Sequence, residues 1–126
     1  MSITPVIDVA QLEMMTGGDS ALAAEALGIF RNQADLWGRM LDPGLAPASW
    51  ADAAHTIKGA AKSVGLMDLG EACGRAETLG RSAHVTPAQA GVAIADIKDR
   101  LGEAMEAIAE MEHRLMHGQG FGRGPA

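Results

Sequence analysis

One histidine, one lysine and one glycine at helical spacing form the part of this sequence best suited to chemistry. His55 is followed by Lys58 and Gly59, at i+3 and i+4. Residues three and four apart are neighbours on the surface of a helix. A neutral imidazole near pH 7 keeps one nitrogen with a free lone pair. The pattern therefore predicts a nucleophilic histidine beside a cation, with bare backbone one turn away.

The apolar residues around this histidine predict that it faces solvent. They recur at the 4-3-4-3 spacing of a buried helical stripe: Trp50, Ala54, Ile57, Ala61 and Val64. At 3.6 residues per turn, His55 lies roughly 100° from Ala54 and roughly 200° from Ile57, which places it off that stripe. Lys58, Gly59 and Lys62 share its side. With Asp52, the two lysines make the segment from Trp50 to Gly65 net positive on a chain of net charge −6.

Composition predicts one all-α domain. The 126 residues are 48% hydrophobic, which is enough for a single core, while aromatics are 3% and tyrosine is absent. No alternating pattern predicts a strand. The negative charge argues against a nucleic-acid partner. Neither a secretory leader nor a run of about 18 apolar residues is present. With Cys73 the one cysteine, we expect a cytoplasmic protein that uses neither a membrane nor a disulfide.

Turn and capping residues divide the chain into five helices, at about residues 6–14, 21–41, 47–64 and 67–82, with a fifth from residue 87 past residue 115. Asp19 or Ser20 caps the second helix, and Gly65 ends the third. We expect an antiparallel four-helix bundle with a short additional N-terminal helix. The bundle domain covers residues 1–117, and residues 118–126 form a flexible glycine-rich tail.

Each long helix carries an apolar row that we expect to be buried. The row of the second helix is Leu22, Ala26, Ile29, Leu36 and Met40. The row of the fourth helix is Leu69, Ala72, Cys73, Ala76 and Leu79. The row of the fifth helix is Ile94, Ile97, Leu101, Ala104, Ile108, Met111 and Leu115. Such spacing suits near-parallel packing of helices in a bundle.

His55-x-x-Lys58-Gly59, with Gly65 ten positions after the histidine, resembles the histidine-containing phosphotransfer (HPt) domain family. The likeness covers about residues 20–116, and its motif lies between residues 50 and 80. It implies a four-helix bundle whose exposed histidine carries a phosphoryl group between receiver domains of a two-component phosphorelay. Family members often hold a glutamate or glutamine that hydrogen-bonds the imidazole twenty-two positions after it. Here that residue is Glu77.

The resemblance assigns roles to the residues of the predicted site. His55 is the phosphoacceptor, and Glu77 orients its imidazole. Lys58 stabilises the phosphoryl group, Gly59 leaves clearance for a receiver, and Lys62 is a possible electrostatic contributor. From the residues alone, Gly70, Gly74, Glu77 and Arg81 share one face of the fourth helix, so the glycines allow close approach beside the site.

No glycine-rich nucleotide loop follows a strand, so we expect a phosphocarrier intermediate and not an enzyme with kinase activity of its own. No cofactor of its own is expected, and Mg²⁺ should sit on the partner receiver domain. His113 and His117 have a spacing that can hold a metal, but no third ligand is evident, and we expect none bound.

The expected partners are the receiver domains of a hybrid histidine kinase and of a response regulator, met by a monomer. The initial methionine and the short chain favour a free-standing carrier. Two alternatives stay open: the phosphoacceptor domain of a chemotaxis-type kinase, and a helical adaptor that binds receivers without being phosphorylated. Phe30 and Trp37 are either core residues or an extension of the receiver-docking surface.

Overall fold

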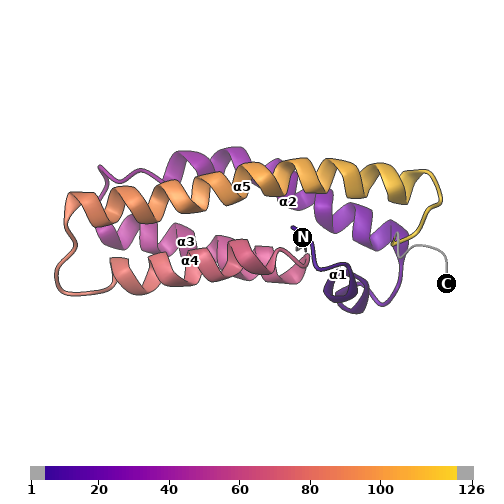
Figure 1. Cartoon of the computed structure of the whole chain (residues 1–126), viewed down its shortest axis with the longest axis horizontal. Helices are drawn as coiled ribbons and strands as arrows, with labels where there is room; N and C mark the ends of the chain where they lie inside the picture. The colour runs from indigo at the N-terminus through magenta and orange to yellow at the C-terminus, as the bar shows by residue number, and fades with distance from the viewer. Residues whose placement is uncertain (1–4, 122–126) are drawn as a thin grey trace, which may run out of the picture.

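The structure is a computed structural model that describes residues 5–121. These residues form five helices and no strand. The helices are α1 (Val9–Met15), α2 (Ser20–Met40), α3 (Pro47–Ser63), α4 (Met67–Gly80) and α5 (Pro87–Met116). The four long helices lie along one axis, and each packs against the next, with α5 returning to α2 (Figure 1). The predicted antiparallel four-helix bundle with a short leading helix is confirmed.

Short polar side chains fix where the helices begin, because they accept hydrogen bonds from backbone N–H groups that have no partner inside the helix. Asp19 caps α2 by accepting from the Leu22 N–H at 3.1 Å. Asp8 caps α1 in the same way, so α1 starts three residues later than predicted. Thr86 begins α5 with a reciprocal capping box.

Gly65 joins the end of α3 to the start of α1. Its φ of +82° is a left-handed conformation that favours glycine, as the predicted C-terminal cap requires. The Gly65 carbonyl accepts a hydrogen bond from the Asp8 N–H at 2.7 Å. A Cβ at residue 65 would lie only 2.5 Å from the Asp8 carbonyl oxygen. The glycine therefore permits both the turn and the docking of α1.

The apolar rows predicted for α3 and α5 are buried along their whole length. In α4, Leu69, Ala72, Cys73 and Ala76 are buried, and Leu79 is half-buried. These rows meet the buried face of α2 in one continuous core. The side chain of His55 lies off this buried face and is exposed, as predicted.

The row predicted for α2 is wrong. Ala26 is half-buried, and the other members are 40% to 57% exposed: Leu22, Ile29, Leu36 and Met40, which we call the α2 outer stripe. The buried row lies one residue further along: Ala23, Leu27, Phe30, Ala34, Trp37 and Leu41. Both rows have helical spacing, but the second holds two aromatic rings, whose burial removes the larger apolar area from water.

Phe30 and Trp37 are core residues. Their rings make an edge-to-face contact with centroids 5.1 Å apart, and both are at least 93% buried. This geometry is favourable for the quadrupoles of the two rings. The aromatic pair thereby fixes which face of α2 turns inward, and leaves the α2 outer stripe without a partner among the described residues.

The predicted tail begins with turns that pack back on the bundle. Phe121 is buried, whereas residues 122–126 lie outside the described residues. A flexible tail over residues 118–126 therefore stays a prediction. Among the described residues, none of the helices combines the length and apolar character needed to cross a bilayer.

Candidate functional site

His55 projects from the middle of α3 and is held through one ring nitrogen. Its side chain is 64% exposed, and Nδ1 lies 2.8 Å from Oε2 of Glu77 on α4. A carboxylate can only accept a hydrogen bond, so the neutral imidazole carries its proton on Nδ1. Nε2 has no partner among the described residues and keeps its lone pair. This arrangement leaves an exposed nitrogen nucleophile of defined orientation.

Glu77 is bound on both of its oxygens and is only 16% exposed. While Oε2 faces His55, Oε1 accepts a hydrogen bond from Lys58 Nζ at 2.8 Å. The hydrogen bond from Lys58 above all, together with the charges of Lys58 and His55, lowers the pKa of Glu77 below its ordinary value. Glu77 is therefore an ionised hydrogen-bond acceptor at neutral pH.

A second cation approaches the same carboxylate from the other side. Arg81, the C-terminal cap of α4, lies one helical turn after Glu77, and its Nε is 3.5 Å from Glu77 Oε2. The guanidinium also donates to Asp52 Oδ1 of α3 at 2.8 Å. That hydrogen bond is the main reason that the pKa of Arg81 is raised. The site is thus a chain of alternating charges that crosses twice between α3 and α4.

The facing surfaces of α3 and α4 match residue by residue. Along α3, Asp52, His55, Lys58 and Lys62 occupy one side, and their partners on α4 run in the opposite direction. Asp52 meets Arg81, His55 meets Glu77, Lys58 lies over Gly74, and Lys62 lies over Gly70. We call this set the α3–α4 ladder. Successive members are three or four residues apart on both helices, so each step is about one helical turn, and the antiparallel order brings the two sets opposite each other.

The two glycines of the ladder make room for lysine stems. A Cβ at Gly70 would lie 2.9 Å from Lys62 Cγ, and one at Gly74 would lie 3.5 Å from Lys58 Cδ. The space beside both glycines is thus filled by aliphatic segments of lysine side chains, and at Gly70 the Lys58 carbonyl oxygen of α3 would also lie 3.7 Å from the Cβ. Lys62 does not reach Glu77, since no ion pair joins the two.

Gly59 lies one turn after His55 on an exposed part of α3. A Cβ at this position would meet no atom within 4 Å. The fold itself therefore does not require glycine here, and the free space next to the imidazole is open to a second molecule.

The structure brings together His55, Lys58 and Glu77, with Gly59 one turn away, as the sequence predicted. Their roles in phosphoryl transfer stay predictions. The ion pair of Lys58 with Glu77 was not predicted, since Lys58 was expected beside phosphoryl oxygens. No role in the site was predicted for Asp52 and Arg81. The signal was available in the spacing, because Asp52 lies one turn before His55, and Arg81 lies one turn after Glu77.

The remaining candidate groups do not add to this site. His113 and His117 stack with ring centroids 4.0 Å apart, and within residues 5–121 no three metal-binding side chains gather. Cys73 is a buried core residue, as predicted. Burial above all, and then the charge of Asp96, raise the pKa of its thiol to about 12, so it stays protonated at neutral pH.

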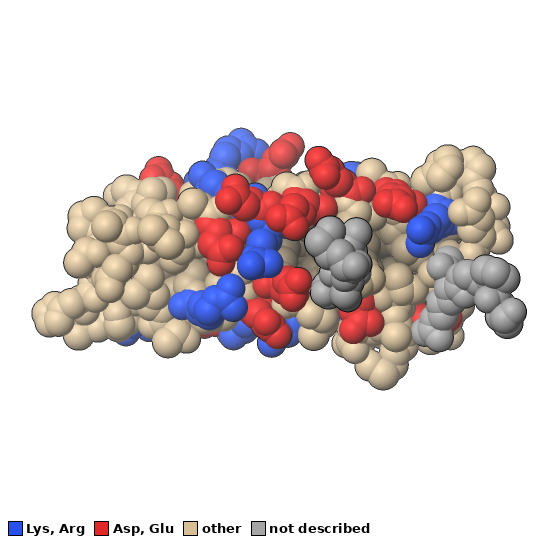
Figure 2. Space-filling model, in the orientation of Figure 1, with Lys and Arg blue, Asp and Glu red and all other residues tan. Residues whose placement is uncertain are grey.

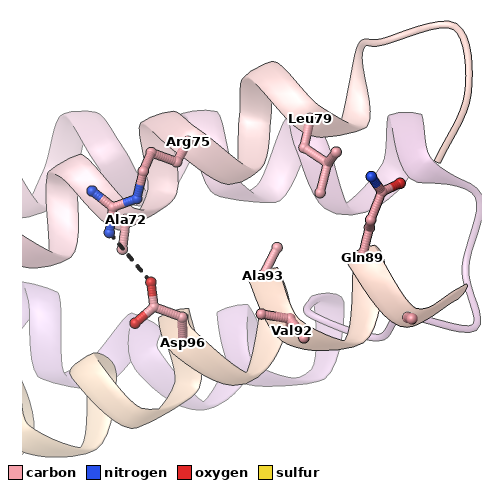
Figure 3. A pocket seen from close by; sticks show the side chains of 8 residues that line it. Ala72, Arg75, Leu79, Gln89, Val92, Ala93 and Asp96 are labelled. Atoms are coloured by element: carbon pink, nitrogen blue, oxygen red, sulfur yellow. Dashed lines mark hydrogen bonds and ion pairs between the residues drawn. The ribbon is translucent and has the colours of Figure 1, made fainter. Parts of the chain in front are cut away.

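A shallow groove lies between α4 and α5, on the side of α4 opposite Glu77. Its floor is apolar, with Ala72, Leu79 and Ala93 among the lining residues (Figure 3). Arg75 closes one end by reaching Asp96 of α5 at 3.3 Å. In the view of Figure 2, charged side chains gather over the middle of the bundle and are sparse at the end that holds the α4–α5 connection.

Comparisons with known proteins place this geometry in a family. The family model described as Hpt domain matches residues 23–111. Among solved structures, the crystal structure of the histidine phosphotransferase ShpA from Caulobacter crescentus is similar, with a TM-score of 0.71 and 37% sequence identity. The match covers 90% of this chain and 97% of that one. No curated protein matched in the corresponding search. On the extent of the family match and this identity, the chain belongs to the Hpt domain family.

Proposed function

We propose that this chain is a histidine phosphocarrier of a two-component phosphorelay, in which His55 passes a phosphoryl group between aspartates of receiver domains. The observation that carries the proposal is the hydrogen bond between His55 Nδ1 and Glu77, because it leaves Nε2 exposed as the nucleophile. Membership of the Hpt domain family and the likeness to a histidine phosphotransferase support the same function.

The chemical step is a displacement at phosphorus. The lone pair of His55 Nε2 attacks the aspartyl phosphate of the donor receiver, and an N–P bond forms as the P–O bond to the aspartate breaks. The electron pair of the broken bond stays on the aspartate, which leaves as a carboxylate. The proton on Nδ1 remains, so the ring becomes a cation whose charge Glu77 balances. The same step in reverse transfers the group to the next receiver.

Other residues of the site assist this transfer in the proposal. Lys58 starts from its ion pair with Glu77, and its flexible stem lets the ammonium turn toward the phosphoryl oxygens. Lys62 adds positive charge one turn further along α3. The open space at Gly59 admits the receiver's aspartate. The receiver is expected to bring the Mg²⁺, and the carrier needs no cofactor of its own.

The α2 outer stripe supports docking of such a partner. Four large apolar side chains in one row stay 40% to 57% exposed. Ile29 borders a shallow groove that Ala60 and Ser63 of α3 also line, so the stripe adjoins the helix that carries His55. Exposed apolar patches of this kind mark interaction sites. We infer that receivers of a hybrid histidine kinase and of a response regulator cover this surface on a monomeric, cytoplasmic carrier.

Phosphotransfer from purified receivers tests the function. The wild-type chain and His55→Gln are mixed with Mg²⁺ and a panel of phosphorylated receiver domains, and acid-labile phosphate on the chain is followed. We expect label on the wild type alone, without any activity toward ATP. Equal labelling of both proteins overturns the assignment of His55. Receiver binding without label on the wild type favours the adaptor, and phosphorylation only by an attached kinase core favours a domain of a chemotaxis-type kinase.

A further inference from the structure

The carboxylate that orients His55 is itself held by two cations of different kinds. Lys58 binds Glu77 Oε1 through a single ammonium at the end of a flexible stem. Arg81 approaches Oε2, the oxygen that faces His55, at 3.5 Å. Oε1 is therefore held by Lys58, and Oε2 has His55 and Arg81 beside it. If the Glu77 carboxylate rotated, it would move away from the positive charges of both Lys58 and Arg81.

The guanidinium of Arg81 has partners on two helices, whereas the ammonium of Lys58 binds Glu77. Its planar fork can contact two partners at once, and here it spans from Glu77 on its own helix to Asp52 on α3. The hydrogen bond to Asp52 Oδ1 is 2.8 Å long. Asp52 lies one turn before His55 on the same helix, so Arg81 ties the backbone that carries the histidine to the carboxylate that orients it.

We propose that Arg81, braced by Asp52, is a positioning residue for phosphotransfer that holds the Glu77 carboxylate in place against His55 Nδ1. This inference rests on the proposed function. Arg81 acts through Glu77, and it is distinct from a simple link between helices. A link alone would change stability, whereas a positioning residue sets which ring nitrogen carries the proton. Of the charged groups around the site, Glu77 contacts His55, Lys58 and Arg81 contact Glu77, and Asp52 contacts Arg81.

The test is the tautomer of His55 in the free protein. Two-bond proton–nitrogen spectra of the ¹⁵N-labelled full chain are recorded about two pH units above the ordinary histidine pKa of about 6.5, with His55→Gln identifying the signal. We expect the Nδ1–H form in the wild type. Glu77→Ala should lose this preference, and Arg81→Gln should lose part of it. Arg81→Lys keeps the charge but cannot contact Glu77 and Asp52 at once, so it should restore only part of the preference.

Arg75→Gln is the matched control, because Arg75 is also an exposed arginine of α4 that pairs with a neighbouring helix (Figure 3). It should leave the tautomer unchanged. Asp52→Ala should shift the tautomer in the same direction as Arg81→Gln. The double variant Asp52→Ala/Arg81→Gln should lose no more of the Nδ1–H preference than Arg81→Gln alone, because both substitutions act through the same Asp52–Arg81 contact. Thermal unfolding of each variant shows whether the fold is intact.

Phosphoramidate, a small phosphoryl donor that needs no docking surface, supplies the second measurement. We expect Arg81→Gln to be phosphorylated about tenfold more slowly than the wild type. At metal sites, removing the residue that hydrogen-bonds a metal-binding histidine costs about 10- to 100-fold in affinity or activity, and we take the lower end of that range. If Arg81→Gln keeps the tautomer and the phosphorylation rate of the wild type, as the control Arg75→Gln is expected to do, the proposal is overturned. If no variant accepts phosphoryl groups, the phosphocarrier function fails, and the tautomers still decide the role of Arg81.

Discussion

Lys58 crosses from α3 to α4 directly over Gly74. Its Cδ lies 3.5 Å from the place where a Cβ on that glycine would be, and its ammonium ends 2.8 Å from Glu77 Oε1. A lysine on a protein surface ordinarily samples many rotamers. Here a missing side chain on one helix provides the path for a long side chain from the other, so that a cation is kept within reach of His55.

Loss of this cation should slow the chemistry more than it affects folding. We expect Lys58→Gln to reduce the rate of phosphorylation of His55 by about fivefold or more, since charge pairs near 4 Å remain significant even when partly solvated. Lys62→Gln should have a smaller effect, because Lys62 lies a turn further away. Rates with phosphoramidate measure both. Lys98→Gln on α5 controls for the loss of a positive charge, and equal rates in the three variants would contradict the role of Lys58.

Gly59→Ala should separate stability from function. Alanine is favoured over glycine inside a helix by about 1 kcal/mol, and the added methyl group meets no atom within 4 Å. We therefore expect a higher free energy of unfolding together with slower transfer from a phosphorylated receiver. Gly102→Ala on α5 is the control, since residue 102 is exposed and equally open. Gly102→Ala should gain stability without slowing transfer. If Gly59→Ala behaves in the same way, phosphotransfer does not depend on open space at residue 59.

The α2 outer stripe should matter for binding and not for folding. Ile29→Ser and Leu36→Ser replace side chains that are 57% and 50% exposed. We expect weaker binding of receivers in a titration, with little change in the denaturation midpoint. Leu27→Ala, in the buried row of the same helix, should instead cost about 2–5 kcal/mol of stability. Unchanged receiver affinity in both serine variants would place the docking surface elsewhere.

The lowered pKa of Glu77 predicts a specific loss of stability in acid. Above the ordinary pKa of about 4.5, the folded and unfolded states both hold Glu77 ionised, and its ion pairs contribute fully. As the pH falls below that value, the unfolded state takes up the proton first, so the contribution shrinks until the pH passes the folded pKa. The free energies of unfolding of the wild type and Glu77→Gln, measured with urea, should therefore become more similar as the pH falls below about 4.5. A difference that stays constant with pH would contradict the shift.

Cys73 should be unreactive in the folded protein. Burial raises the pKa of its thiol to about 12, and the thiolate is the reactive form. We expect a thiol-specific reagent to label it only after unfolding in denaturant. Rapid labelling under native conditions, compared with the unfolded chain, would show that the α4 core opens readily.

Much of the site could be predicted because it depends on short spacings within one helix. His55, Lys58 and Gly59 are placed together by helical geometry alone. The pairing with Glu77 came from the family resemblance, and α4 has the register that it required. Asp52 and Arg81 were not linked, because a spacing along one helix does not by itself show how two helices align. Only after His55 is paired with Glu77 does the antiparallel order place Asp52, one turn before the histidine, opposite Arg81, one turn after the glutamate.

The buried face of α2 was predicted wrongly for a different reason. Its sequence carries two apolar rows about 100° apart, and either one satisfies the helical pattern. The choice between them is made by packing, where Phe30 and Trp37 fill the core. A second apolar row on a helix whose core face is already occupied is thus itself a signal of an interaction surface, once the fold is known.

The charged contacts around His55 all lie within one hairpin, since α3 and α4 are joined by a short turn and the paired residues are at most 29 positions apart. The α2 outer stripe belongs to a different helix. Mutations can therefore accumulate in the α2 outer stripe without disturbing the reactive hairpin. In evolutionary terms, a duplicated copy of the gene could acquire a new signalling partner by changes on one helix while inheriting its phosphoryl chemistry intact.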